Sequence, residues 1–319
     1  MKLSRFRPLS VQKDGFKERK EGFAKSPLVR HLSDEELKLL KSAVFEAFED
    51  FDCVAKKHSV FYTASGGTVL GSIRHQGFIP WDDDIDLMMP RKDFNIFKAV
   101  FEEELGEKYS LCAPELGAEH GMTMCQMKRR GTILRSYNEV SKADAGIPLD
   151  IFVLENTFDS PVLRRLHGIA CLAAGFLMTA RKTYHDLPYL EPYLAGNDTL
   201  RRSLAKKATL GRLVSFLSLD QLSLFAYRIY SLCHNDSSKY VTIPSGRKHF
   251  FGELYLRGDM CRAKESDFEG RMIPIPYGYK TYLHALYGNN YMEPPPEEDR
   301  EQHPVMEFSF GALKQEDHV

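Results

Sequence analysis

An acidic run that leads directly into an apolar stretch is the feature that most limits how this chain can fold. Four of the five residues from 82 to 86 are aspartates: Asp82, Asp83, Asp84 and Asp86. The apolar residues Leu87-Met-Met89 follow directly. Ile85 interrupts the run, so the carboxylates are tied to a predicted strand rather than to a freely solvated loop. Because successive strand side chains point to opposite faces, we expect Asp82, Asp84 and Asp86 on one face and Asp83 on the other.

Two carboxylates at this spacing can share a metal ion. Residues two apart on a strand are about 6 to 7 Å apart at the backbone. A magnesium ion with ligands at about 2.0 to 2.1 Å would relieve the repulsion between Asp84 and Asp86 and keep sites for phosphate oxygens and water. A solvated acidic loop is the alternative. An EF-hand does not fit, because Leu87 and Asp93 stand where it needs glycine and glutamate.

A pair of glycines precedes the acidic run. Ser65-Gly66-Gly67-Thr68 follows a strand predicted over residues 60–63, and Thr68 is expected to cap a short helix that ends near Gly77. Backbone N–H groups at such a bend can approach a phosphate. A Gly-Gly pair alone usually marks only a turn, so the prediction of a phosphate site depends on the nearby Asp-x-Asp pair. Arg74 and His75 are candidates to cover the phosphate, with ordinary surface residues as the alternative.

A third carboxylate is expected inside a strand. Residues 147–154 are apolar except for Asp150, and a lone buried carboxylate is costly. Asp150 is explained if it faces the same metal or takes a proton from an acceptor hydroxyl. A structural salt bridge is the alternative.

The remaining pattern divides the chain into four segments. A capping box at Ser33 predicts a helix over 34–51, and phenylalanines at helical spacing predict another over 91–105. Residues 122–134 are a further strand candidate, 160–233 are helical, and strands and turns follow. The predicted division is an N-terminal arm (1–30), a core (31–159), a helical segment (160–239) and a C-terminal segment packed on the core (240–319).

Charge and hydropathy limit the partners. Lysine and arginine (43) nearly balance aspartate and glutamate (44), so no field favours nucleic acid. The N-terminus lacks an apolar signal-peptide stretch, which predicts a cytoplasmic protein. Residues 166–180 are apolar with basic flanks but shorter than the roughly 18 to 20 residues of a membrane span. A buried helix is expected there, and a helix at the inner membrane surface is the alternative.

Residues 62–90 resemble the signature of the LicD family, above all from Ser65 to Asp86. That family includes bacterial phosphocholine transferases and is related to the fukutin-type ribitol-phosphate transferases. The similarity continues, less densely, in Pro148-Leu-Asp-Ile-Phe152 and in a C-terminal block from Ile275 to His303-Pro. Asn289 stands where family members often have aspartate, which removes one charge.

The resemblance implies an α+β, nucleotidyltransferase-like fold, with a mixed sheet flanked by helices and a helical insertion. Asp84 and Asp86 match the family's metal-binding pair, and Asp150 is similar to its third carboxylate. These three are therefore the expected catalytic and metal-binding residues, with Mg²⁺ or Mn²⁺ as the cofactor. The helical segment carries no motif that would identify the acceptor.

The expected activity is transfer of phosphocholine from CDP-choline to a hydroxyl of a glycan or glycolipid, with release of CMP, as in lipopolysaccharide or teichoic acid biosynthesis. The residues expected to bind the substrate lie at the glycine bend or are polar and aromatic candidates elsewhere: Ser65, Gly66, Gly67, Thr68, Arg74, His75, Trp81 and Lys128. Trp81 or a C-terminal tyrosine could face a quaternary ammonium by cation–π attraction. The alternatives are nucleotidyl transfer to a sugar or small alcohol phosphate, and a non-catalytic, calcium-dependent glycan-binding protein.

Overall fold

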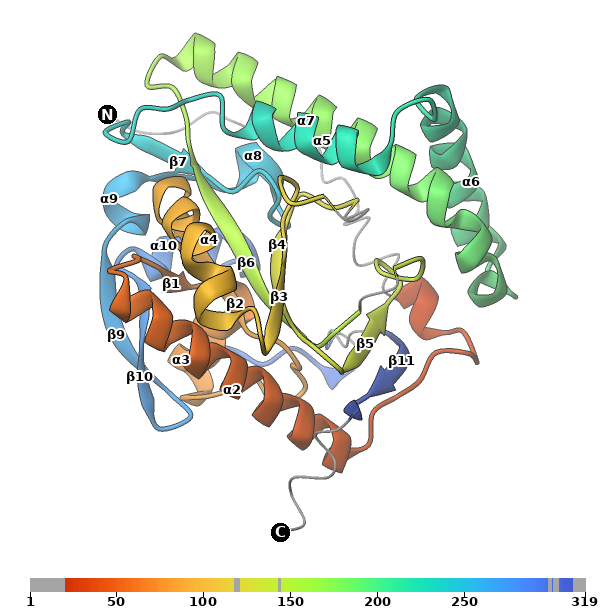
Figure 1. Cartoon of the computed structure of the whole chain (residues 1–319), viewed down its shortest axis with the longest axis horizontal. Coiled ribbons are helices and arrows are strands. Elements are labelled where there is room, and N and C mark those ends of the chain that lie inside the picture. The colour runs from red at the N-terminus through yellow and green to blue at the C-terminus, as the bar shows by residue number, and fades with distance from the viewer. Residues whose placement is uncertain (1–20, 118–120, 143–144, 298–299, 301–303, 312–319) are drawn as a thin grey trace.

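A mixed β-sheet flanked by helices occupies the centre of the molecule (Figure 1). A computed structural model describes residues 21–117, 121–142, 145–297, 300 and 304–311. Residues 1–20 of the predicted N-terminal arm and His303 lie outside the described residues. The α+β class is confirmed, whereas the nucleotidyltransferase-like architecture and the four-segment division stay predictions.

The main sheet has the strand order β1-β2-β6-β4-β3, and β7 and β8 extend it from the end of β6. Its strands are β1 (Thr63–Ala64), β2 (Asp86–Pro90), β3 (Tyr109–Cys112), β4 (Cys125–Arg129), β6 (Pro148–Asn156), β7 (Tyr240–Thr242) and β8 (Leu254–Leu256). Two small antiparallel sheets pair β9 (Ala263–Phe268) with β10 (Arg271–Pro276), and β5 (Ile133–Ser136) with β11 (Val305–Ser309). Only β2 and β6 pair in parallel among the described strands.

One group of helices packs near this sheet, and a second group forms a separate layer along one side of it (Figure 1). The helices nearest the sheet are α2 (Asp34–Lys57), α3 (Gly66–His75), α4 (Arg91–Leu105), α8 (His249–Gly252), α9 (Arg257–Met260) and α10 (Tyr279–Tyr287). The layer at the top and right of Figure 1 consists of α5 (Pro161–Leu190), a 3₁₀ turn (Glu191–Leu194), α6 (Asp198–Leu213) and α7 (Leu219–Tyr230).

Two helix predictions are confirmed. Ser33 and Glu36 form the expected reciprocal capping box, and α2 continues to Lys57 because the buried Val54 and Ala55 prolong its apolar face. Helix α4 has the predicted bounds, and its phenylalanines face the core: Phe94, Phe97 and Phe101. These two helices therefore follow directly from local pattern.

The strand predictions near the acidic run need correction. Strand β2 begins at Asp86, not at Asp82, and all of its following residues are buried instead of alternating. The reason is that β2 lies between β1 and β6, with packed residues on both faces. The strand expected over 60–63 is only Thr63–Ala64. The strand expected over 122–134 is two strands, β4 and β5, separated by a turn in which Gly131 has a φ of +74°.

The apolar segment 166–180 lies within α5, a helix of 30 residues. Among the described residues, α5 with its 3₁₀ extension is the one helix long and apolar enough, by length and composition, to cross a membrane. The expectation of a buried helix is met on one face only. Cys171, Ala174 and Met178 pack against α7 and α8, whereas Leu166 and Ile169 are more than half exposed.

A buried ion pair joins this helical layer to the sheet. Arg91, at the start of α4, binds both carboxylate oxygens of Glu155 near the end of β6, and its Nε lies 3.1 Å from Oε2. The Arg91 guanidinium also lies 3.9 Å from the ring centroid of Tyr227 on α7. The Glu155 side chain is 2% exposed, so the pair depends on mutual neutralisation.

We expect Glu155→Gln to lower the free energy of unfolding by about 3 kcal/mol, because it leaves the Arg91 charge buried without a counter-ion. The melting temperature should fall by roughly 5 to 10 °C in a thermal scan. Glu191→Gln is the control, because the Glu191–Arg201 pair is about half exposed and should be worth less than about 1 kcal/mol. Equal losses in the two variants would contradict this role for the buried pair.

Candidate functional site

The parallel pairing of β2 with β6 brings the predicted carboxylates together. Asp86 opens β2 and lies directly opposite Asp150 in the register of β6. Asp84 precedes the strand by two residues, and one carboxylate oxygen from each of the three residues lies within 4.8 Å of the other two. The convergence of Asp84, Asp86 and Asp150 expected from the sequence is therefore present in the structure.

This donor set fits a hard divalent cation. Oxygen ligands at about 2.0 to 2.1 Å from Mg²⁺ are at most about 4 Å apart, so small side-chain adjustments would close the three carboxylates around one ion. Calcium, with ligands at about 2.3 to 2.6 Å, fits the same oxygens. Asp82, Asp83 and Asp84 form a second, overlapping group in which Asp83 is buried. Asp84 is common to both groups.

The glycine bend packs against these carboxylates. Gly66 has a φ of +44°, and a Cβ on it would come within 3.0 Å of the Asp86 carboxylate. A Cβ on Gly67 would meet Asp82 just as closely. Position 66 therefore favours glycine through its backbone conformation as well as this close approach, whereas at Gly67 the close atom is the end of the Asp82 side chain. The Gly66 amide donates to the hydroxyl of Tyr282, 2.9 Å away.

Reciprocal hydrogen bonds lock the start of α3 to the start of β2. The Ser65 amide donates to the Asp86 carbonyl at 2.8 Å, and the Asp86 amide donates to Thr68 Oγ1 at 2.9 Å. Thr68 is therefore not the helix cap predicted from the sequence. Ser65 is the N-cap residue, and its hydroxyl lies 2.8 Å from that of Tyr282. At the other end, Gln76 rather than Gly77 takes the left-handed conformation that ends the helix.

Arg74, His75 and Trp81 form a cluster beside the acidic run. The His75 and Trp81 rings make an edge contact at 6.4 Å, and Arg74 donates to the Tyr291 carbonyl at 2.8 Å. The guanidinium of Arg300 lies 4.5 Å from the Trp81 ring centroid. Burial and the nearby Arg74 lower the pKa of His75, which favours a neutral imidazole. The cluster is thus anchored to the C-terminal segment.

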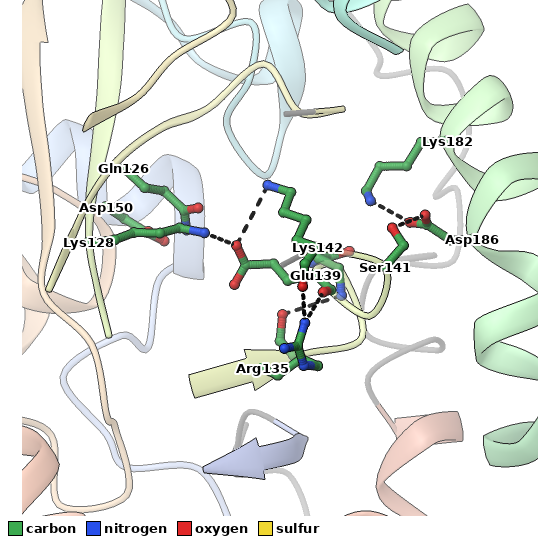
Figure 2. Close-up of polar contacts among 11 residues, drawn as sticks. Gln126, Lys128, Arg135, Glu139, Ser141, Lys142, Asp150, Lys182 and Asp186 are labelled. Carbon is green, nitrogen blue, oxygen red and sulfur yellow. Dashed lines mark hydrogen bonds and ion pairs between the residues drawn. The ribbon is translucent and has the colours of Figure 1, made fainter. Parts of the chain in front are cut away.

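Lys128 lies on the other side of the site, in a buried ion pair (Figure 2). Its ammonium contacts Glu139, and the Nζ of Lys142 lies 3.6 Å from the same carboxylate. Burial lowers the pKa of Lys142 to about 8. The Lys128 side chain, expected to contact phosphate, is completely buried and holds Glu139 next to the sheet.

Three residues that sequence reasoning missed complete the surroundings. Gln126 lies opposite Asp150 in the register of β4, and its Nε2 donates to Asp150 Oδ1 at 2.8 Å (Figure 2). Lys41 of α2 donates to the carbonyls of Ile79 and Pro80, just before the acidic run. Tyr282 lies in the C-terminal block that resembles the LicD family, and this resemblance was the one sequence feature that could have indicated its place at the site. Gln126 and Lys41 carry no local motif.

Comparisons with known proteins agree with this geometry. Residues 59–153 match the family model described as LicD/FKTN/FKRP, nucleotidyltransferase domain. The matched range contains the glycine bend, the acidic run and Asp150.

A curated relative aligns over most of the chain. The lipopolysaccharide cholinephosphotransferase LicD of Haemophilus influenzae is 27% identical over 266 residues, which cover 81% of this chain and 91% of the relative. Uncharacterised proteins of Rickettsia prowazekii and Rickettsia typhi are 34% and 31% identical over 68 and 61 residues, in each case 19% of this chain. Residues 59–153 are therefore similar to the LicD/FKTN/FKRP family model, and most of the chain is similar to a LicD protein.

Proposed function

We propose that this protein transfers phosphocholine from CDP-choline to a hydroxyl of a glycan or glycolipid and releases CMP, with Mg²⁺ or Mn²⁺ as its cofactor. The proposal depends on one observation, the convergence of Asp84, Asp86 and Asp150 beside the Gly66-Gly67 bend. The similarity to a lipopolysaccharide cholinephosphotransferase over 81% of the chain supports this choice of donor and acceptor. We also propose a cytoplasmic location.

In the proposed reaction, the acceptor oxygen attacks the phosphorus that bears choline. The bond from that phosphorus to the oxygen of CMP breaks, and CMP leaves with the electron pair. Asp150 takes the proton of the attacking hydroxyl, while Gln126 orients the Asp150 carboxylate through the 2.8 Å hydrogen bond to its Oδ1. A metal ion held by Asp84, Asp86 and Asp150 would neutralise charge on the diphosphate.

The glycine bend supports the donor side of the proposed site. Gly66 and Gly67 let the Asp86 and Asp82 carboxylates approach the backbone at the start of α3, so a metal ion held by these acids would lie beside the helix N-terminus, which favours a phosphate. Ser65 and Thr68 hold that bend against β2 through their hydrogen bonds. Arg74 is half-buried next to the acidic run, where it interacts with Asp82, and would supply positive charge to a phosphate lying there.

Asp84→Asn, Asp86→Asn and Asp150→Asn should each lower CMP release from CDP-choline by about 100-fold or more, because each removes charge from the reacting centre. Melting temperatures should stay close to that of the parent protein, since neutralising one of several like charges relieves repulsion. Release of CMP is followed by chromatography in the presence of Mg²⁺ or Mn²⁺. The control is Asp198→Asn, an exposed carboxylate at the start of α6, which should leave activity unchanged.

The same variants test the non-catalytic, calcium-binding alternative, which the oxygen spacing also allows. A structural calcium site predicts a large loss of melting temperature in the double variant Asp84→Asn plus Asp86→Asn, and no turnover in the parent protein. Full activity of the double variant would overturn the proposed role of both residues.

Gln126→Leu should lower activity less than Asp150→Asn does, by about 10-fold, because a group that orients a metal or proton ligand contributes about 10- to 100-fold. The metal concentration that gives half-maximal activity should rise. If Gln126→Leu were as inactive as Asp150→Asn with an unchanged fold, Gln126 would itself contact the reacting groups.

Nucleotidyl transfer is the second candidate, because the matching family model is described as a nucleotidyltransferase domain. CDP-choline labelled either in choline or in cytidine separates the two reactions, with lipopolysaccharide and teichoic acid preparations as acceptors. We expect the choline label in the acceptor and the cytidine label in CMP. Cytidine label in the acceptor would show nucleotidyl transfer instead.

A further inference from the structure

Helix α5 presents an apolar face that no described residue covers. Exposed apolar side chains recur every three or four residues along it: Val162, Leu166, Ile169, Leu172, Phe176 and Leu177. Leu166 is 58% and Ile169 52% exposed. This spacing places them on one side of the helix, and the row is about 22 Å long at 1.5 Å per residue. A soluble monomer rarely leaves so long an apolar row in water.

The opposite side of α5 is fixed to the protein. His167 lies between Thr157 and the Ile229 carbonyl, with ring nitrogens 3.1 and 2.9 Å from them. Cys171 and Met178 belong to the core that α5 shares with α7 and α8. A helix that crossed a bilayer would have to break these contacts, so α5 is built to lie along a surface.

The connection between α6 and α7 enlarges this face. Leu213 and Phe216 are 71% and 79% exposed. Arg181 of α5 donates to the Leu217 carbonyl at 3.1 Å, which holds the connection beside the helix. Lys207 of α6 lies 5.9 Å from the Phe176 ring centroid. We refer to the six exposed α5 side chains together with Leu213 and Phe216 as the α5–α6 face. The helices α5 and α6 lie at the top and right of Figure 1.

Basic residues outnumber acidic ones in the segment that carries the α5–α6 face. Residues 161–213 contain nine lysines or arginines but only three aspartates or glutamates, although the whole chain has a net charge of −1. Several of the basic residues are exposed: Arg165, Arg202, Lys206 and Arg212. An apolar strip bordered by basic side chains is complementary to anionic lipid headgroups above an acyl layer. A second copy of the chain would place two basic surfaces together, which is unfavourable.

We propose that the α5–α6 face binds the surface of an anionic phospholipid bilayer, with α5 parallel to the membrane plane. The apolar row enters the boundary between headgroups and acyl chains, and the basic residues contact lipid phosphates. This binding does not depend on the transferase activity proposed above. It would bring the enzyme to the surface on which a glycolipid acceptor is displayed.

Vesicle flotation tests this proposal without an activity assay. The full chain is mixed with vesicles of phosphatidylcholine containing phosphatidylglycerol, or of phosphatidylcholine alone, so the difference between them reports lipid charge. We expect binding to the anionic vesicles, weakened by raising NaCl to roughly 0.5 M because salt screens the attraction. The triple variant Leu166→Gln, Ile169→Gln and Phe176→Gln should bind at least ten-fold less.

A matched triple variant controls for general loss of apolar surface. Leu28→Gln, Leu116→Gln and Met272→Gln change side chains of similar exposure on other elements and should bind like the parent protein. Lack of parent binding to anionic vesicles, or equal binding by both triple variants, would overturn the proposal. So would light scattering that showed a dimer lost in the α5 variant, or membrane association that resisted extraction at alkaline pH, as a spanning helix would.

Discussion

The parallel pairing of β2 with β6 is the constraint on which the site depends. The pairing sets Asp86 opposite Asp150, and the Asp150 amide donates to the Ile85 carbonyl at 3.1 Å. A slip of one residue would turn Asp150 to the other face of the sheet. The neighbouring elements depend on the same register, because the glycine bend fits against Asp86 and Gln126 bonds to Asp150. The buried apolar residues of both strands fix this register, so packing energy positions like charges that would otherwise separate.

Local spacing supported the helix predictions and the Asp84–Asp86 pair, and Asp150 was expected beside them because a lone carboxylate in an apolar strand needs a partner. Distance along the chain explains the contacts that the sequence did not indicate. The pair Asp84 and Asp86, the capping box at Ser33 and helix α4 each depend on residues a few positions apart. Burial of β2 on both faces could not be inferred, because an apolar run has the same pattern in a strand as in a buried helix. Lys41 contacts residues 38 and 39 positions away. Gln126 and Asp150 are 24 positions apart. No motif marks such pairs in a single sequence.

The balanced net charge conceals two separate charged regions. Aspartates gather at the end of the sheet, whereas lysines and arginines gather on α5 and α6. The buried pair of Lys128 with Glu139 contributes to neither region, because the two charges cancel inside the protein. The pI of the whole chain, about 6.8, reflects the sum of all charges and so does not reveal either region. The three-dimensional arrangement places the carboxylate cluster beside the sheet and the basic residues on the helical layer.

The contact between Tyr282 and Ser65 has a consequence for biosynthesis. It joins residues 217 positions apart, so the wall behind the glycine bend is supplied by a helix that is translated long after the bend itself. A nascent chain can pair β2 with β6 and collect the three carboxylates long before Tyr282 has left the ribosome. The three carboxylates can therefore come together before α10 packs behind the glycine bend. Ribosome-bound intermediates would lack this wall until α10 has been translated.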